Sequence, residues 1–263
     1  MVSARLSPFG FVGSISFDSA ITPTSVARYV ALVERAQRWR KIKALILRIN
    51  SPGGDAAASE QFFQALRKTD EVKPVYCYVD SMAASGGYYV ACAGRRVYAP
   101  PNAVIGSIGV IWRKAVLAEL LGKLGISLQV LTKGEHKDMF SMHRPLSDEE
   151  KVAVGSLMQD VYQQFIARVA ERRGKSVDEI TGLGTGEVFS SSKSLSLGLI
   201  DGLKSYREAL EELAKSVGVS PNRVIQLSPH RPFMARLFGV STSEIMDVFY
   251  DRLLRESIGS LLV

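Results

Sequence analysis

The sequence contains little cysteine and little histidine, which limits the kinds of site that it can build. Its two cysteines, Cys77 and Cys92, lack metal-ligand spacing, and a secreted disulfide scaffold would contain more of them. The three histidines, His136, His143 and His230, are too scattered to form a zinc site. We therefore expect buried small cysteines, no metal and no other cofactor.

Long apolar runs are also missing from the chain. No stretch approaches the ~20 residues that a spanning helix needs, and the opening MVSARLSPFG has too little apolar length for a signal sequence. These absences predict a chain without a transmembrane segment or signal peptide. We expect it to be cytoplasmic or peripherally attached to a membrane.

Neither sign of charge dominates any one segment. The net charge is +7, but the 33 basic residues alternate with 26 acidic ones along the chain. This pattern favours a slightly basic, solvated surface and no nucleic-acid partner. With 263 residues and 46% apolar content, the chain is long and apolar enough for a globular fold without metal or disulfides.

The pattern that is present alternates strands with helices, which predicts an α/β fold with a largely parallel sheet. The expected strands are Gly10–Phe17, Ala44–Ile49, Pro74–Val79 and Ser127–Thr132, and the expected helices are Ser25–Arg40, Asp55–Lys68, Tyr88–Gly94 and Asp148–Arg173. We divide the chain into a folded part, residues 1–217, and residues 218–263, which hold a linker and an amphipathic tail from Pro232 onward. This tail is a possible peripheral membrane contact.

One serine, Ser85, lies where an expected strand ends and a helix begins, in VDSMAASGGYYV. Its neighbours are small, so a ligand could approach its hydroxyl, and the free amide of Gly86 could face a developing oxyanion. The segment alone favours a helix cap and a nucleophile equally. It is not the G-x-S-x-G elbow, because Ala83 replaces the first glycine.

A second glycine-rich turn, NSPGG at residues 50–54, follows another expected strand. Alone it indicates a tight turn, but two such turns at one sheet edge could supply the two donors of an oxyanion hole. A nucleophilic serine also needs a base, and GEHKDM offers His136 and Lys137.

Five motifs in order resemble the signal peptide peptidase A family, over residues 10 to 205. They are RINSPGG (48–54), MAASGGYY (82–89), IGSIGV (105–110), GEHKDM (134–139) and GEVFSSSKSLSLGLID (186–201). The resemblance implies a serine-lysine protease with the Clp protease/crotonase fold, built of repeated β-β-α units, and makes residues 1–217 the catalytic domain. Phe140 and Ser141 depart from the Gly-Ser pair common in the family.

The family pattern implies a role for each matching residue. Ser85 matches the nucleophile, Lys137 the general base and Ser107 the serine that orients this lysine. Gly54 and Gly86 match the oxyanion donors, with Gly53 as an alternative to Gly54. The resemblance also implies apolar, extended peptide substrates and a homo-oligomeric ring whose sites are shared between neighbours.

Two other functions compete with a peptidase of apolar peptides such as cleaved signal peptides. One is a crotonase-like acyl-CoA enzyme, in which the glycine turns would hold a thioester oxyanion. The other is an inactive assembly module, which would have no reason to keep Ser85, Ser107 and Lys137 together.

Overall fold

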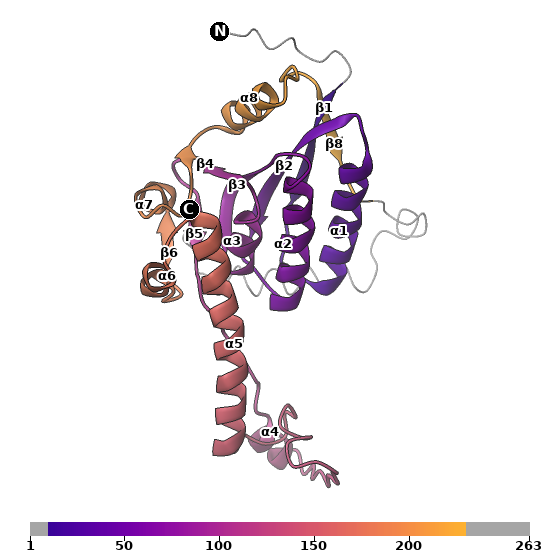
Figure 1. Cartoon of the computed structure of the whole chain (residues 1–263). Coiled ribbons are helices and arrows are strands. Elements are labelled where there is room, and N and C mark those ends of the chain that lie inside the picture. The colour runs from indigo at the N-terminus through magenta and orange to yellow at the C-terminus, as the bar shows by residue number, and fades with distance from the viewer. Residues whose placement is uncertain (1–9, 230–263) are drawn as a thin grey trace. The chain divides into compact units, whose positions relative to one another are not determined.

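A computed structural model describes residues 10–229 of the chain, which form two compact units (Figure 1). We call residues 10–108 and 165–229 the body, and Gly109–Gln164, which interrupts the body in sequence, the insert. Each unit is described by itself, because their positions relative to each other are not determined.

One eight-stranded sheet runs through the body. Its strands are β1 (Phe11–Phe17), β2 (Ile42–Ser51), β3 (Val75–Ala84), β4 (Arg96–Ala99), β5 (Val104–Gly106), β6 (Val188–Ser190), β7 (Gly202–Leu203) and β8 (Val224–Leu227). The order is β6-β5-β3-β2-β1-β8, and β4 pairs with β3 and β7. Only β5 and β6 pair antiparallel. The predicted α/β fold with a largely parallel sheet is confirmed.

Helices cover the sheet, which explains why its central strands are almost continuously apolar. The helices are α1 (Pro23–Arg38), α2 (Ala56–Asp70), α3 (Gly86–Ala91), α4 (Ala118–Lys123), α5 (Asp148–Arg173), α6 (Val177–Leu183), α7 (Ser191–Ser196) and α8 (Tyr206–Ser216). Figure 1 shows α1 and α2 side by side in front of the sheet. On another part of the sheet, Ala44 and Ile46 of β2 lie in a buried cluster with Leu213 of α8.

Local sequence signals set the helix starts in the body. Thr22 caps α1 by accepting a hydrogen bond from the Ser25 amide, and Asp55 caps α2 in the same way for Ala58. Most of the expected elements, which were predicted from local apolar patterns, agree with the structure to within a few residues. The expected helix Asp148–Arg173 is α5, and Cys77 and Cys92 are free and buried as predicted.

The prediction of a strand at Ser127–Thr132 was wrong. This segment of the insert has no regular secondary structure and pairs with no strand among residues 10–229, and its Leu131 side chain is 91% exposed. The apolar pattern typical of a strand is present, but a strand also needs a neighbour to satisfy its backbone groups.

The segment predicted as a linker, residues 218–232, holds a strand. Its residues Val224–Leu227 form β8, which pairs parallel with β1 and so extends the sheet. The prediction missed β8 because the strand has only four residues, flanked by turn-forming residues. The predicted tail from Pro232 to Val263 lies outside the described residues. No helix among residues 10–229 is both long and apolar enough to cross a membrane.

Candidate active site

Three strands that are neighbours in the sheet end at the same edge of the body. Ser51 of β2 pairs with Ala83 of β3, and Ala84 of β3 pairs with Gly106 of β5. Because the three strands are parallel, the residues that follow them emerge together. This edge therefore brings the NSPGG turn, Ser85 and Ser107 into one region of the body, as the sequence predicted for the first two.

Ser85 has a backbone conformation that is rare for a residue with a side chain. Its φ is 50° and its ψ is −125°, a region that costs about 1 to 3 kcal/mol and persists only where the surroundings impose it. Its amide donates to the Gly106 carbonyl at 2.8 Å, and its carbonyl accepts from the Tyr89 amide at 3.0 Å. The neighbouring strand and helix α3 thus hold the strained backbone in place.

The half-buried Ser85 side chain does not cap α3. Ser85 occupies the cap position, but its hydroxyl makes no capping hydrogen bond. Since a capping serine would be expected to use its hydroxyl for this bond, the structure leaves the hydroxyl available for other chemistry. The sequence favoured a helix cap and a nucleophile equally at Ser85, and the missing capping bond argues against the helix cap.

Glycines around Ser85 allow the two turns to touch. A Cβ atom on Gly53 would lie 2.8 Å from the Ser85 Cβ, and one on Gly86 would lie 2.4 Å from the Ser59 Oγ. A Cβ on Gly87 would lie 2.7 Å from the Ser51 carbonyl oxygen. Since real Cβ atoms do not approach so closely, only glycine lets the NSPGG turn, α3 and α2 pack together here.

The hydrogen bonds of this region distinguish Gly54 from Gly53. The Gly53 amide donates to the Ser51 Oγ at 3.2 Å, and the Gly53 carbonyl accepts from the Ile21 amide at 2.8 Å. The amides of Gly54 and Gly86, in contrast, donate to no acceptor within residues 10–229. The Gly54 nitrogen also lies only 3.4 Å from the position of a Cβ on Gly86. Two backbone amides that donate no hydrogen bond within residues 10–229 therefore lie close together beside Ser85.

Ser51 is a residue of this edge that the sequence analysis did not single out. Its side chain is fully buried, and its hydroxyl is the acceptor that fixes the Gly53 amide. A buried serine in a turn of the form N-S-P-G-G could have drawn attention, because a buried hydroxyl needs a partner.

Ser107 follows β5 and has the other positive φ among the described residues other than glycine, 51°. Its amide donates to the Glu187 carbonyl at 2.7 Å, and β6, which follows Glu187, pairs antiparallel with β5. The late motif that begins GEVFSS thus supports the backbone at Ser107. This explains in structural terms why residues 80 positions apart occur in one pattern.

The two candidate bases, His136 and Lys137, lie in the insert, in a loop of successive turns. The Lys137 amide donates to the Gly134 carbonyl at 3.2 Å, and the side chain of Lys137 is exposed. The structure therefore brings Ser85, Ser107, Gly54 and Gly86 together in the body and places Lys137 in the other unit.

A network of charges fixes the loop next to Lys137. Arg144 donates to Asp138 at 2.8 Å and to both oxygens of Glu150 at 2.8 and 2.7 Å. The hydrogen bond from Arg144 lowers the pKa of Asp138, and those from Arg144 and the Ser147 amide lower the pKa of Glu150 to about 2. Both carboxyl groups are ionised at neutral pH, so the network is intact there.

Comparison with known proteins connects this edge to a protein family. The sequence model of peptidase family S49 matches residues 67–220, which include Ser85, Ser107 and Lys137. The chain belongs to this family. Membership makes it a serine protease by class and confirms the resemblance drawn from the five motifs. Because the matching family consists of peptidases, the match does not support the alternative function of a crotonase-like acyl-CoA enzyme.

Relatives in this family are about a third identical to the chain over the segments that match. A putative protease of Synechocystis is 34% identical over 76% of this chain and 73% of its own length. The chloroplastic serine protease SPPA of Arabidopsis thaliana is 32% identical over 78% of this chain, but the match spans only 31% of that longer protein. The S49 chain thus corresponds to a part of the plant enzyme.

A solved structure supports the fold of the S49 chain. A point mutant of ClpP1 from Listeria monocytogenes superposes with a TM-score of 0.53, over 74% of this chain and 92% of its own. The identity is 12%, so the likeness concerns the fold alone. The Clp protease-like fold that the resemblance implied is confirmed.

Proposed function

We propose that this S49 peptidase cleaves short, extended, apolar peptides, such as signal peptides after their release, through an acyl-enzyme at Ser85. The conformation of Ser85 is the observation on which the proposal mainly rests. The backbone of Ser85 is strained, its hydroxyl makes no capping hydrogen bond, and the two neighbouring amides donate to no acceptor within residues 10–229. Such an arrangement is costly to a fold and useful to a nucleophile.

In the proposed reaction, the Ser85 Oγ attacks the peptide carbonyl carbon and its proton passes to the neutral amine of Lys137. The carbonyl oxygen becomes an oxyanion, which accepts hydrogen bonds from the amides of Gly54 and Gly86. The C–N bond then breaks, and the leaving amine takes the proton back from Lys137. Water attacks the resulting ester in the same way and releases the acid and Ser85.

Lys137 needs a different environment to act as this base. A lysine in water titrates near ~10.4, and burial in a low-dielectric site favours the neutral amine. Because the Lys137 side chain is exposed in the single chain, we propose that assembly buries it. Ser107 would then orient the amine toward Ser85, as the family pattern implies.

The proposed assembly is a closed ring of identical copies in which a neighbour completes each site. The insert supports it, because apolar side chains cover much of its surface. The exposed ones are Ile111, Trp112, Val116, Leu120, Leu124, Ile126, Leu128, Val130, Leu131, Phe140, Met142, Val152 and Leu157. Exposed apolar surface of this extent is typical of a protein interface.

An apolar substrate preference agrees with the side chains near Lys137 in the insert. The rings of Trp112 and Phe140 pack with centroids 5.9 Å apart, and both are partly or largely exposed. Phe140 replaces the small residue common at this position in the family, so we propose that it contacts the substrate.

A labelling experiment tests the nucleophile. We expect wild-type protein to hydrolyse an unfolded apolar polypeptide and to react with a fluorophosphonate at Ser85. The Ser85→Ala variant should lose both, with at least a roughly 10⁴-fold lower rate and an unchanged melting temperature. Ser81→Ala, four residues earlier in β3, is the matched control and should keep both activities. Turnover by Ser85→Ala near the wild-type rate would refute the assignment.

Mixing two inactive variants tests the shared site. Equal amounts of Ser85→Ala and Lys137→Ala subunits, dissociated and reassembled together, would combine one intact Ser85 with a neighbour's intact Lys137 in roughly a quarter of the sites. We expect activity to return to about this fraction. No recovery in mixed assemblies of confirmed composition would mean that each site lies within one chain.

A further inference from the structure

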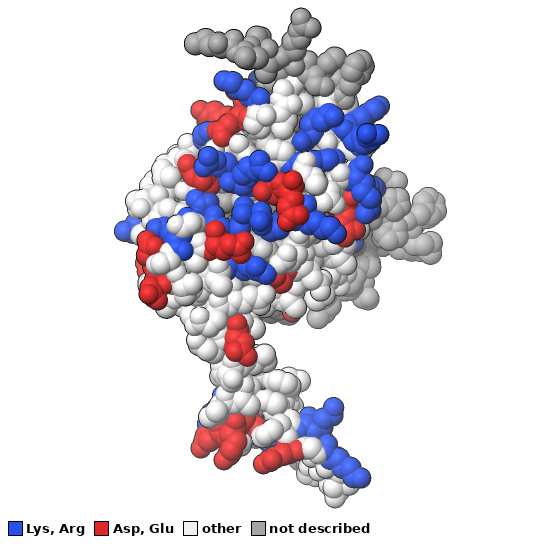
Figure 2. Space-filling model, viewed as in Figure 1, with Lys and Arg blue, Asp and Glu red and all other residues white. Residues whose placement is uncertain are grey.

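The body has a strongly basic region at the edge opposite to Ser85. It is formed where α1 and α2 end and where β2 and β3 begin, and Figure 2 shows Lys and Arg gathered over this part of the body. We call it the basic pole and define it as Arg35, Arg38, Arg40, Lys41, Lys43, Lys68 and Lys73. The pole is not evident in the sequence, because along the chain these residues alternate with others.

Hydrogen bonds join the two halves of the basic pole into one surface. The Gln37 Nε2 donates to the Lys68 carbonyl at 2.9 Å, which links the ends of α1 and α2. The Lys73 Nζ donates to the carbonyls of Ala36 and Trp39 at 2.9 and 2.8 Å, which joins the start of β3 to the end of α1. Burial and, second, the charge of Lys43 lower the pKa of Lys73.

The charges of the basic pole are largely uncompensated. Arg38 lies 3.7 Å from Glu34, but both side chains are well exposed, and such pairs contribute little. The other basic residues defined above make no ion pair within the described part of the chain. Several basic side chains elsewhere in the body have close acidic partners, as Arg173 has in Asp201 at 2.9 Å and Arg48 has in Asp80 at 2.9 Å.

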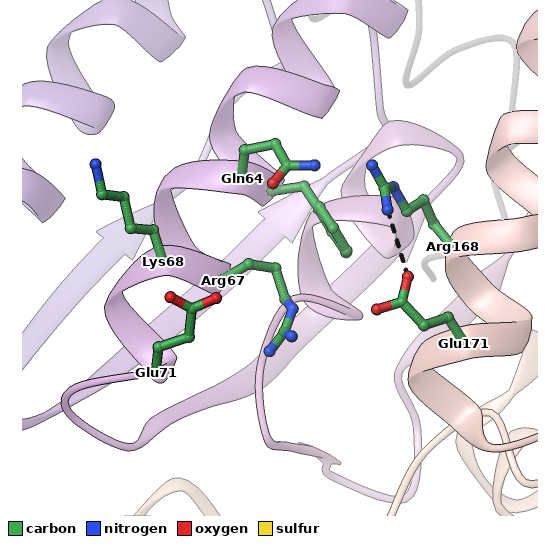
Figure 3. Close-up of a pocket in the computed structure, with 7 residues that line it drawn as sticks. Gln64, Arg67, Lys68, Glu71, Arg168 and Glu171 are labelled. Carbon is green, nitrogen blue, oxygen red and sulfur yellow. Dashed lines mark hydrogen bonds and ion pairs between the residues drawn. The ribbon is translucent and has the colours of Figure 1, made fainter.

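A neighbouring pocket between α2 and α5 lacks this imbalance. Figure 3 shows that Arg168 and Glu171 form an ion pair in it, at 3.3 Å, and that Glu71 adds a second carboxylate. Lys68 lines the same pocket but extends away from this pair. The pocket thus carries both signs of charge, and the excess of positive charge belongs to the basic pole.

Two apolar side chains stand among these charges. Trp39 is 41% exposed and Val72 is 65% exposed, and the bond from Lys73 to the Trp39 carbonyl holds the two segments together. Tryptophan favours the boundary between lipid headgroups and acyl chains, and lysine and arginine favour anionic headgroups. A nucleic acid would satisfy the charges but would make no use of an aliphatic side chain such as Val72.

We propose that the basic pole binds the surface of a membrane rich in anionic phospholipid. Trp39 and Val72 enter the headgroup region, and the surrounding lysines and arginines lie against the phosphates. The ten residues of β2 separate the pole from the Ser85 edge by about 30 Å. A bound body therefore keeps that edge away from the lipid. The proposal does not depend on the chemistry at Ser85.

Vesicle binding by the full chain tests the proposal. We expect the protein to co-sediment with vesicles of phosphatidylcholine containing about a third phosphatidylglycerol, and not with phosphatidylcholine alone, and raised salt should weaken the binding. The triple variant Arg40→Glu, Lys41→Glu, Lys43→Glu should bind at least about 100-fold more weakly, since each basic residue near an anionic surface contributes about fivefold. Its hydrolysis of a soluble peptide should be unchanged.

The matched control is Lys123→Glu, Lys193→Glu, Arg207→Glu, which alters the net charge equally at exposed residues outside the pole. It should bind like wild type. In a Trp112→Phe background, Trp39 is the remaining tryptophan, and its emission should shift to the blue on anionic vesicles. Four results would each overturn the proposal. They are equal losses of binding in both triple variants, undiminished binding by the pole variant, an unshifted Trp39 emission, and tighter binding to duplex DNA than to the vesicles.

Discussion

The body and the insert bury their apolar residues to very different degrees, and helix α5 shows the contrast within one element. In its last turns, which belong to the body, Phe165, Ile166 and Val169 are buried. In its first turns, which belong to the insert, Val152 is 74% exposed and Leu157 is 58% exposed. The body has a core of its own, whereas the insert presents apolar side chains that the described residues of the chain leave exposed.

The two units also differ in the interactions that stabilise them. The body is stabilised by the apolar packing of helices on a sheet, and the insert relies more on the hydrogen bonds of Arg144 with Asp138 and Glu150. The division extends to the proposed chemistry, since the nucleophile and its oxyanion donors lie in the body and the base lies in the insert. If the proposal is right, changes in the insert will lower the activity of a site whose nucleophile lies in the body.

The largest effect is expected at Lys137. Lys137→Ala should lower kcat/KM by about 10²- to 10⁴-fold, the usual contribution of a general base. Lys137→Arg should be equally inactive, because a guanidinium does not release its proton. His136→Ala should keep most activity, and wild-type kcat/KM should rise with pH through the neutral to alkaline range. An inactive His136→Ala beside an active Lys137→Arg would replace the serine-lysine pair with a serine-histidine pair.

The next effect concerns the exposed apolar surface of the insert. We expect Leu128→Glu combined with Leu131→Glu to dissociate the assembly, since both side chains are largely exposed in the single chain and a charge would be buried in an interface. Light scattering should show a smaller particle, and activity should fall at least about tenfold while the helix content stays constant. Leu195→Glu, an exposed apolar position of the body, is the control. An active variant of unchanged size would exclude this segment from the interface.

A smaller effect is expected at Ser51, within the body. Ser51→Ala removes the acceptor of the Gly53 amide, and leaving that buried donor unsatisfied should cost about 1 to 3 kcal/mol of unfolding free energy. The turn that holds the Gly54 amide should loosen, so we expect kcat to fall about tenfold to a hundredfold with little change in KM.

Ser14→Ala provides the comparison for Ser51. Ser14 is equally buried, and its hydroxyl accepts from the Tyr206 hydroxyl, whose residue lies in α8. The variant should lose similar stability but no kcat. Equal kcat losses in the two variants would mean that Ser51 acts only through stability.

The contrast between the units also explains which features the sequence could predict. Ser85, Ser107 and the NSPGG turn follow strands whose apolar runs are local, so their placement at one edge follows from parallel pairing. The choice between Gly53 and Gly54 depends on the Ser51 hydroxyl, a side-chain contact that no pattern specifies. The strand expected at Ser127–Thr132 failed because strand formation requires a partner, and the basic pole was missed because distant residues form it.

The smallest expected effect is a response of the insert to acid. The pKa of Glu150 is lowered to about 2, chiefly by its hydrogen bonds with Arg144, so its contribution to stability is fully present above the unfolded value of about 4.3. That contribution is lost as the pH falls from there toward 2. In Trp39→Phe protein, the emission of Trp112, which packs on Phe140 in the insert, should therefore change between about pH 4 and pH 2. Glu150→Gln should remove most of this change, and Glu179→Gln, at an exposed carboxylate of the body, should not. An unchanged Trp112 transition in Glu150→Gln would show that the apolar contacts of the insert, and not this network, hold it together.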